Sequence, residues 1–214
     1  MKLTTLKKAA ARCHLTVIGA FHPKVADNAP SGTCTLILLG PYETGFWAHF
    51  SASPEMLDGQ PDPLDRWSKR VVTPLASELG GTAVFPFGGP PYQPFIAWAL
   101  RSQRCWVSPS GLLVHDKEGL FVSFRGAIAL PIKIDLPPPP PPPCQTCIAE
   151  PCRSSCPVGA LKTDSYDVAA CKADLDRPEN DCMTRGCASR RACPISQRYG
   201  RVEAQSAFHM AAFK

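Results

Sequence analysis

The chain has 214 residues, of which 44% are hydrophobic, with 11 cysteines and a formal net charge of +5 at pH 7. This length suits one large domain or two small ones with a real hydrophobic core. No basic run alternates with aromatic residues and no apolar run approaches eighteen residues, so the sequence predicts neither a nucleic-acid nor a membrane partner. Lys7 and Lys8 precede a segment that Arg12 and His14 interrupt, unlike a signal peptide, so we expect a cytoplasmic protein.

The first 136 residues predict an α/β (α+β) domain. We expect a helix over about residues 3–13, strands over 15–20 and 35–39, and a helix that Asp62-Pro63 begins and Gly80-Gly81 ends. Pro74 is expected to kink or shorten that second helix. Its core-facing side is expected to carry Leu64, Trp67, Val71 and Leu75.

The next elements are predicted from short apolar runs. Residues 112–115 and 120–124 flank a four-residue loop and predict a β-hairpin, and residues 127–130 are expected to continue the sheet. From Ser196 onwards we expect a helix in which Phe208 and Phe213 pack back on the chain.

Eight of the cysteines fall between residues 144 and 193, directly after seven consecutive prolines at residues 137–143. Such a run favours an extended polyproline II spacer of about 20 Å. We therefore expect a domain over 1–136, a linker over 137–143 and a second domain over 144–214. The alternative is that the run is a peptide ligand for an SH3-type module. Cys13, Cys34 and Cys105 lie singly and are expected to be buried small hydrophobes.

The clustered cysteines form two groups, each with three cysteines and a fourth before proline. The groups are Cys144-x2-Cys147-x4-Cys152-x3-Cys156-Pro157 and Cys171-x10-Cys182-x4-Cys187-x5-Cys193-Pro194. In two-cluster ferredoxins the cysteine before proline binds the other cluster. This crossing predicts one [4Fe–4S] cluster on Cys144, Cys147, Cys152 and Cys193, and a second on Cys156, Cys171, Cys182 and Cys187.

These groups predict a metal-binding, bacterial-ferredoxin-like domain that transfers electrons, with a redox partner protein or a small-molecule substrate. Two structural zinc sites would also use eight thiolates, usually as Cys-x2-Cys pairs, and only one such pair is present. A zinc-stabilised interaction protein is the alternative from another functional class. Disulfides would need an oxidising compartment.

Several segments resemble known families. Residues 98–101, 111–115 and 119–124 resemble the epoxyqueuosine reductases, where a helix, a hairpin, a proline-rich step and an eight-cysteine double cluster follow in this order. Cys171 matches the isolated fifth cysteine of that pattern. Residues 124–131 also resemble the vitamin B12-processing chaperone family. The similarity covers residues 90–198 well and residues 1–90 faintly. Both families, with the reductive dehalogenases, share a nitroreductase-like module that binds cobalamin.

The resemblance implies a nitroreductase-like N-terminal domain with a mixed sheet, which binds cobalamin or flavin and receives electrons from the clusters. A cobalamin-dependent reductase or B12-handling protein is thus the alternative function. Arg125 matches an arginine of the chaperone family and is expected to contact an anionic ligand, unless it is a surface group at a strand end. His115 is a candidate lower ligand to cobalt, or else a packed hairpin histidine. Ala97 stands where epoxyqueuosine reductases carry their acidic proton donor, so no catalytic residue is assigned.

Overall fold

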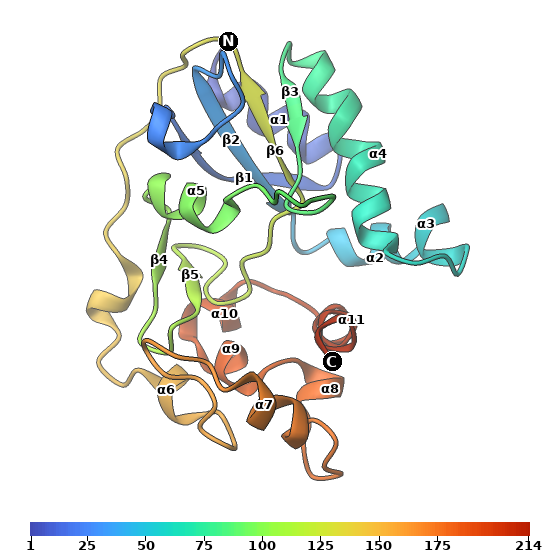
Figure 1. Ribbon diagram of the computed structural model, residues 1–214, viewed down its shortest axis with the longest axis vertical. Coiled ribbons are helices and arrows are strands. Elements are labelled where there is room, and N and C mark those ends of the chain that lie inside the picture. Colours follow the sequence, from blue (N-terminus) through green and yellow to red (C-terminus); the bar gives the residue numbers. More distant parts are fainter. The chain divides into compact units, whose positions relative to one another are not determined.

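The computed structural model describes residues 1–214 and divides them into two compact units (Figure 1). The first unit consists of residues 1–104 and 123–139, and the second of residues 105–122 and 140–214. The chain therefore passes between the units after residues 104, 122 and 139. The expected boundaries differ, because they assign residues 105–122 to the first domain.

The first unit is built on a four-stranded sheet with the order β1-β2-β6-β3. Its strands are β1 (Leu15–Phe21), β2 (Thr35–Pro41), β3 (Thr82–Val84) and β6 (Gly126–Leu130). All three pairings are antiparallel, so the expected mixed sheet is wrong, although the predicted strands themselves are confirmed. Every residue of β2 and β6 is buried, since both strands lie in the middle of the sheet (Figure 1).

The first unit also contains five α-helices. They are α1 (Leu3–Arg12), α2 (Phe46–Ser51), α3 (Pro54–Leu57), α4 (Pro63–Glu78) and α5 (Phe95–Arg101), with a 3₁₀ turn η1 at Val25–Asp27. Helix α1 packs against β1, and α4 packs against β3 and β6. The predicted helices over 3–13 and after Asp62 are confirmed.

Helix α4 differs from its prediction in two details. It continues to Glu78, four residues beyond Pro74, because Pro74 is exposed and the carbonyl that loses its donor can be solvated. Val72, not Val71, is the buried valine, with none of its surface exposed. The helix ends where Gly80 adopts a positive φ of 69°, a conformation that glycine reaches at little cost.

The second unit contains one hairpin and a series of short helices. The hairpin pairs β4 (Cys105–Val107) with β5 (Leu113–His115). The helices are a 3₁₀ turn η2 (Pro143–Thr146), α6 (Pro151–Ser154), α7 (Val168–Asp174), α8 (Cys182–Arg185), α9 (Ala188–Ala192), α10 (Pro194–Arg198) and α11 (Glu203–Phe213). The single helix predicted from Ser196 onwards is instead two helices, α10 and α11, because the chain leaves the helical conformation between Arg198 and Glu203. The Phe213 ring stacks on Tyr166 with centroids 6.1 Å apart.

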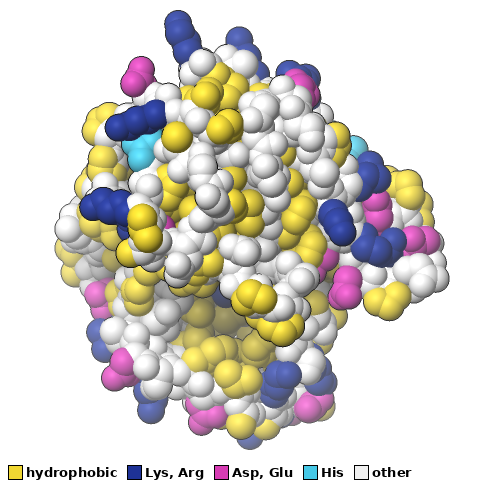
Figure 2. All heavy atoms as spheres, turned by 45° about the horizontal axis from the view of Figure 1, so that its top comes forward, with side chains coloured by type: hydrophobic (Ala, Val, Ile, Leu, Met, Phe, Trp, Pro, Cys, Tyr) yellow, Lys and Arg dark blue, Asp and Glu magenta, His cyan; other side chains and the backbone are white.

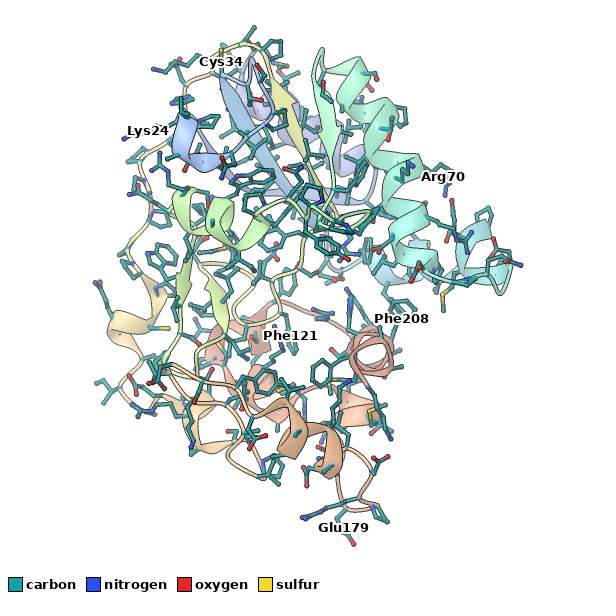
Figure 3. The ribbon with its side chains drawn as sticks, viewed as in Figure 1. Lys24, Cys34, Arg70, Phe121, Glu179 and Phe208 are labelled. Carbon is teal, nitrogen blue, oxygen red and sulfur yellow. The ribbon has the colours of Figure 1, made fainter.

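The predicted hairpin has the wrong partner. Strand β5 pairs with the preceding β4, whereas residues 120–124 form no strand. Leu120 and Phe121 instead contact the cysteine-bearing segment: the Leu120 amide donates to Ser196 Oγ at 2.8 Å, and Arg201 Nη1 donates to the Phe121 carbonyl at 2.8 Å. The Arg201 guanidinium also lies over the Phe121 ring, which is labelled in Figure 3. These contacts place residues 105–122 in the second unit.

The surface carries charges of both signs. On the face drawn in Figure 2, Lys and Arg side chains are interspersed with Asp, Glu and hydrophobic side chains. None of the helices has both the length and the apolar character that a membrane crossing needs.

Candidate functional site

The eight clustered cysteines do not form a site for a metal ion. The structure contains no group of three or more His, Cys, Asp or Glu side chains that could hold one. An ion such as zinc binds its ligands at about 2.0–2.3 Å, so those ligands must converge closely. The prediction of a metal-binding, iron–sulfur site is therefore wrong for the folded chain as the structure describes it. The zinc alternative is removed by the same finding.

Four of the cysteines nevertheless share one cavity in the second unit. Cys144, Cys147, Cys152 and Cys193, called here the first quartet, line a cavity of about 400 Å³. Cys152 and Cys193 are buried against Val114 and Leu120 of the hairpin segment. The fold thus brings together residues separated by almost fifty positions, because α6 packs on α9, which directly precedes Cys193.

The thiols of the first quartet act on one another electrostatically. Burial, with smaller contributions from the charges of Cys152, Cys193 and Cys147, raises the pKa of Cys144 to about 11. Burial also raises the pKa of Cys152, while hydrogen bonds from Ser110 lower it. Cys144 and Cys152 therefore resist ionisation unless positive charge is placed near them.

The remaining four cysteines, Cys156, Cys171, Cys182 and Cys187, form the second quartet. Burial raises the pKa of Cys171, and the charges of Cys187 and Cys156 also raise it. Burial likewise raises the pKa of Cys182, with a further increase from Cys187. Each quartet's thiols thus interact within the quartet. The division of the eight cysteines into two quartets and the ligand assignment both stay predictions.

Several groups donate hydrogen bonds to the second quartet. The Ala160 amide donates to Cys156 Sγ at 3.3 Å. The Tyr166 hydroxyl hydrogen-bonds Cys171, and the backbone of Ala188 hydrogen-bonds Cys182. Such bonds stabilise thiolates over thiols. The sequence does not reveal these donors, because tertiary packing brings each to its sulfur.

Two polar side chains near the second quartet lack partners. Neither the oxygen nor the nitrogen of the Gln205 amide has a hydrogen bond, although the residue is fully buried. Gln205 lies on α11, which packs on α8, the helix that begins at Cys182. The hydroxyl of Ser189, two residues after Cys187, is also buried and unpaired. Because an unsatisfied buried polar group costs about 1–3 kcal/mol, these groups fit a site that binds a hydrogen-bonding ligand.

The three single cysteines differ from one another. Cys105 is buried, as expected, with 2% of its surface exposed. Cys13 is only partly buried, and Cys34 is exposed, so the prediction that all three are buried is wrong. Cys34 lies just before β2 in the first unit, where Figure 3 labels it.

Arg125 is not a surface residue. Its backbone amide donates to the Leu39 carbonyl at 2.8 Å, and only 9% of the residue is exposed. Burial lowers the pKa of Arg125 to about 10, while the Asp65 carboxylate opposes this shift. The guanidinium Nε has no hydrogen-bond partner, and neither has the buried hydroxyl of Ser123, a residue that the sequence does not single out.

His115 is buried in a hydrogen-bonded turn, and Ala97 lies on the exposed side of a helix. His115 Nδ1 accepts from the amides of Lys117 and Glu118 at 3.2 and 3.1 Å, and Nε2 lies 3.2 Å from an Asp116 carboxylate oxygen. With both ring nitrogens engaged, the packed-histidine interpretation is favoured over a cobalt ligand. Ala97 is an exposed residue of α5, immediately before buried Trp98.

Comparison with known proteins adds no family to these observations: no family model, curated protein or solved structure matches the chain. The nitroreductase-like and ferredoxin-like descriptions of the two units therefore stay predictions.

Proposed function

We propose that this protein is a redox protein that transfers electrons through two [4Fe–4S] clusters, one assembled on each cysteine quartet. The observation that carries the proposal is that Cys144, Cys147, Cys152 and Cys193 line one cavity, while the charges of Cys156 and Cys187 act on Cys171. Such a cluster is not a single ion, because each thiolate binds a different iron of a sulfide-bridged core. Its ligands consequently stand farther apart than those of the ion sites that the structure lacks.

The residues around the quartets support this assignment. Positive charge placed among the first-quartet thiols would offset the burial and the repulsion that raise the pKa of Cys144. Val114 and Leu120 pack on Cys152 and Cys193 and would limit the access of water, which affects reduction potential. When bound, the clusters would supply one-electron transfer. The electron donor is proposed to be a redox partner protein, and the acceptor a cofactor or a small-molecule substrate.

The proposal predicts the iron content of cysteine variants. Purified or reconstituted without oxygen, the wild-type chain should hold about eight iron and eight sulfide. Cys147→Ser and Cys187→Ser should each lose about half of this iron, because each removes a ligand from a different quartet. The matched control is Cys34→Ser, whose side chain belongs to neither quartet and should leave the iron unchanged. A colourless, iron-free wild-type protein would refute the proposal.

A second candidate function concerns the first unit, and the observation that favours it is the buried Arg125. A buried guanidinium whose Nε has no hydrogen-bonding acceptor suits a ligand with a phosphate group, which arginine binds through two parallel hydrogen bonds. Flavin mononucleotide and cobalamin both carry such a group. We therefore propose that the first unit binds one of these cofactors, as the alternative of a cobalamin-dependent reductase or B12-handling protein requires. Titration with each, followed by absorbance, separates them: cobalamin should change spectrum through its cobalt and flavin through its ring.

A further inference from the structure

The first unit contains a cavity of about 290 Å³ that neither proposed function uses. Its lining belongs to this unit alone and comes from α1, from β1 and the residue after it, from the end of α5 and the turn that follows, and from the start of the proline run. Four lining side chains are basic and none is acidic: Lys7, His22, Arg101 and Arg104. Such a lining favours a negatively charged ligand.

A tight turn after α5 carries both arginines of this lining. Gln103 has a φ of 54°, so the chain turns directly after the helix ends at Arg101. The Arg104 amide donates to Ser102 Oγ at 3.3 Å, which closes the turn. A Cβ at Gly19 of β1 would lie 2.6 Å from the same oxygen, so glycine lets the turn lie directly on the strand. The backbone that carries both arginines is therefore fixed against β1.

Two contacts hold the side chain of Arg101 in position. Its Nε donates to Asp27 Oδ1 at 3.0 Å, and its guanidinium lies 5.7 Å from the centroid of the Phe21 ring. Asp27 offsets part of the charge of Arg101 but does not itself line the cavity. Lys7 is exposed on α1 and makes no ion pair, so its charge is available to a ligand.

The proline run forms one wall of the cavity through residues 137–139. The chain just before this run is anchored to the sheet, because the Ile134 amide donates to Thr35 Oγ1 at 3.2 Å and His22 Nε2 donates to the Ile134 carbonyl at 2.9 Å. Consecutive prolines are stiff and have no amide hydrogen to donate. This wall is therefore rigid and offers apolar surface without hydrogen-bond donors.

We propose that this cavity binds a small phosphate monoester, with the phosphate among Lys7, Arg101 and Arg104 and the organic group against the prolines. A phosphate monoester carries about −1.5 to −2 charge at pH 7 and three strong acceptor oxygens, so it suits three cationic side chains better than a carboxylate does. The volume is at the lower end of the range for ligand sites, about 300–1,000 Å³, so the ligand is small. Arg125 does not line this cavity, which makes the site separate from the cofactor site proposed above.

The test is isothermal titration calorimetry of the whole chain with phenyl phosphate and, separately, with benzoate. Phenyl phosphate should bind about tenfold more tightly than benzoate, which has the same ring but a carboxylate. Lys7→Gln and Arg101→Gln should each weaken the binding of phenyl phosphate about tenfold. Lys8→Gln is the matched control, because Lys8 is the exposed neighbour of Lys7 on α1 and does not line the cavity. It should bind like the wild type.

If Arg101→Gln fails to fold because its bond to Asp27 is lost, Lys7→Gln decides the question, since Lys7 makes no ion pair. A wild-type chain that binds no phenyl phosphate at millimolar concentration would overturn the proposal. Equal affinity for benzoate, or binding that Lys7→Gln leaves unchanged, would also overturn it. Binding that Arg125→Met abolishes and Lys7→Gln does not would place the phosphate at Arg125 instead.

Discussion

Arg125→Met is expected to increase the free energy of unfolding of the ligand-free protein by about 1–3 kcal/mol. The native guanidinium is buried, its Nε has no acceptor, and burial lowers its pKa to about 10. Methionine has a similar length and keeps the apolar contacts without the cost of desolvating a charge. Its backbone amide can still donate to Leu39 in the sheet. Urea unfolding followed by circular dichroism measures this change.

The same substitution should weaken cofactor binding. If Arg125 holds a phosphate group, the variant should bind flavin mononucleotide or cobalamin at least tenfold more weakly than the wild type, whichever of the two the wild type binds. A gain in stability together with a loss of affinity is the combination expected of a residue kept for binding. A variant that binds equally well would show that Arg125 does not contact the cofactor.

Arg70→Met is the matched control in the same unit. Arg70 makes an ion pair with Glu55, in which Nη2 and Oε2 are 2.9 Å apart. The Glu55 side chain is only 10% exposed, so the substitution leaves a nearly buried carboxylate without its cation. Because the Arg70 side chain is 53% exposed, we expect a modest loss of about 1–2 kcal/mol. If Arg125→Met destabilised the protein as much as Arg70→Met does, Arg125 would instead be a structural cation.

The sheet of the first unit could be predicted from local sequence because its central strands are continuous apolar runs. Residues 35–39 and 127–130 are buried on both faces of the sheet. A short continuous apolar run that is followed by Gly40 and Pro41 is typical of such a buried strand. The strand directions could not be predicted, since long connections allow either direction. The prediction for the buried face of α4 named Val71 instead of Val72. The rotation of the helix about its axis is set by packing against β3 and β6, which the sequence does not show.

The wrong prediction that residues 112–115 and 120–124 form a hairpin has a different cause. The apolar run 120–124 has the composition of a strand. Leu120, however, packs on Cys152 and Cys193, which follow it at a long distance in the sequence. The two quartets are predicted from cysteine spacing alone, and they stay a prediction. The unpaired amide of Gln205 could not be found in this way, since its burial and neighbours depend on the folded chain.

Gly119→Ala is expected to destabilise the second unit by about 3 kcal/mol. Gly119 has a φ of +59°, and a Cβ there would lie 2.5 Å from the Ser196 amide nitrogen and 2.6 Å from Ser196 Oγ. That oxygen accepts the hydrogen bond from the Leu120 amide, so relief of the overlap would separate Leu120 from the cysteine-bearing segment. Amide hydrogen exchange over residues 140–214 measures the loss, and iron retention should fall with it.

Gly159→Ala provides the matched control for this substitution. Gly159 has the same φ of +59°, but a Cβ there would meet nothing within 4 Å. The cost should therefore be only that of the left-handed backbone, about 1 kcal/mol. The difference between the two variants isolates the contact between residues 105–122 and the segment that carries the quartets. Equal losses would mean that this contact adds little to the stability of the second unit, and that the hairpin does not hold the first quartet in place.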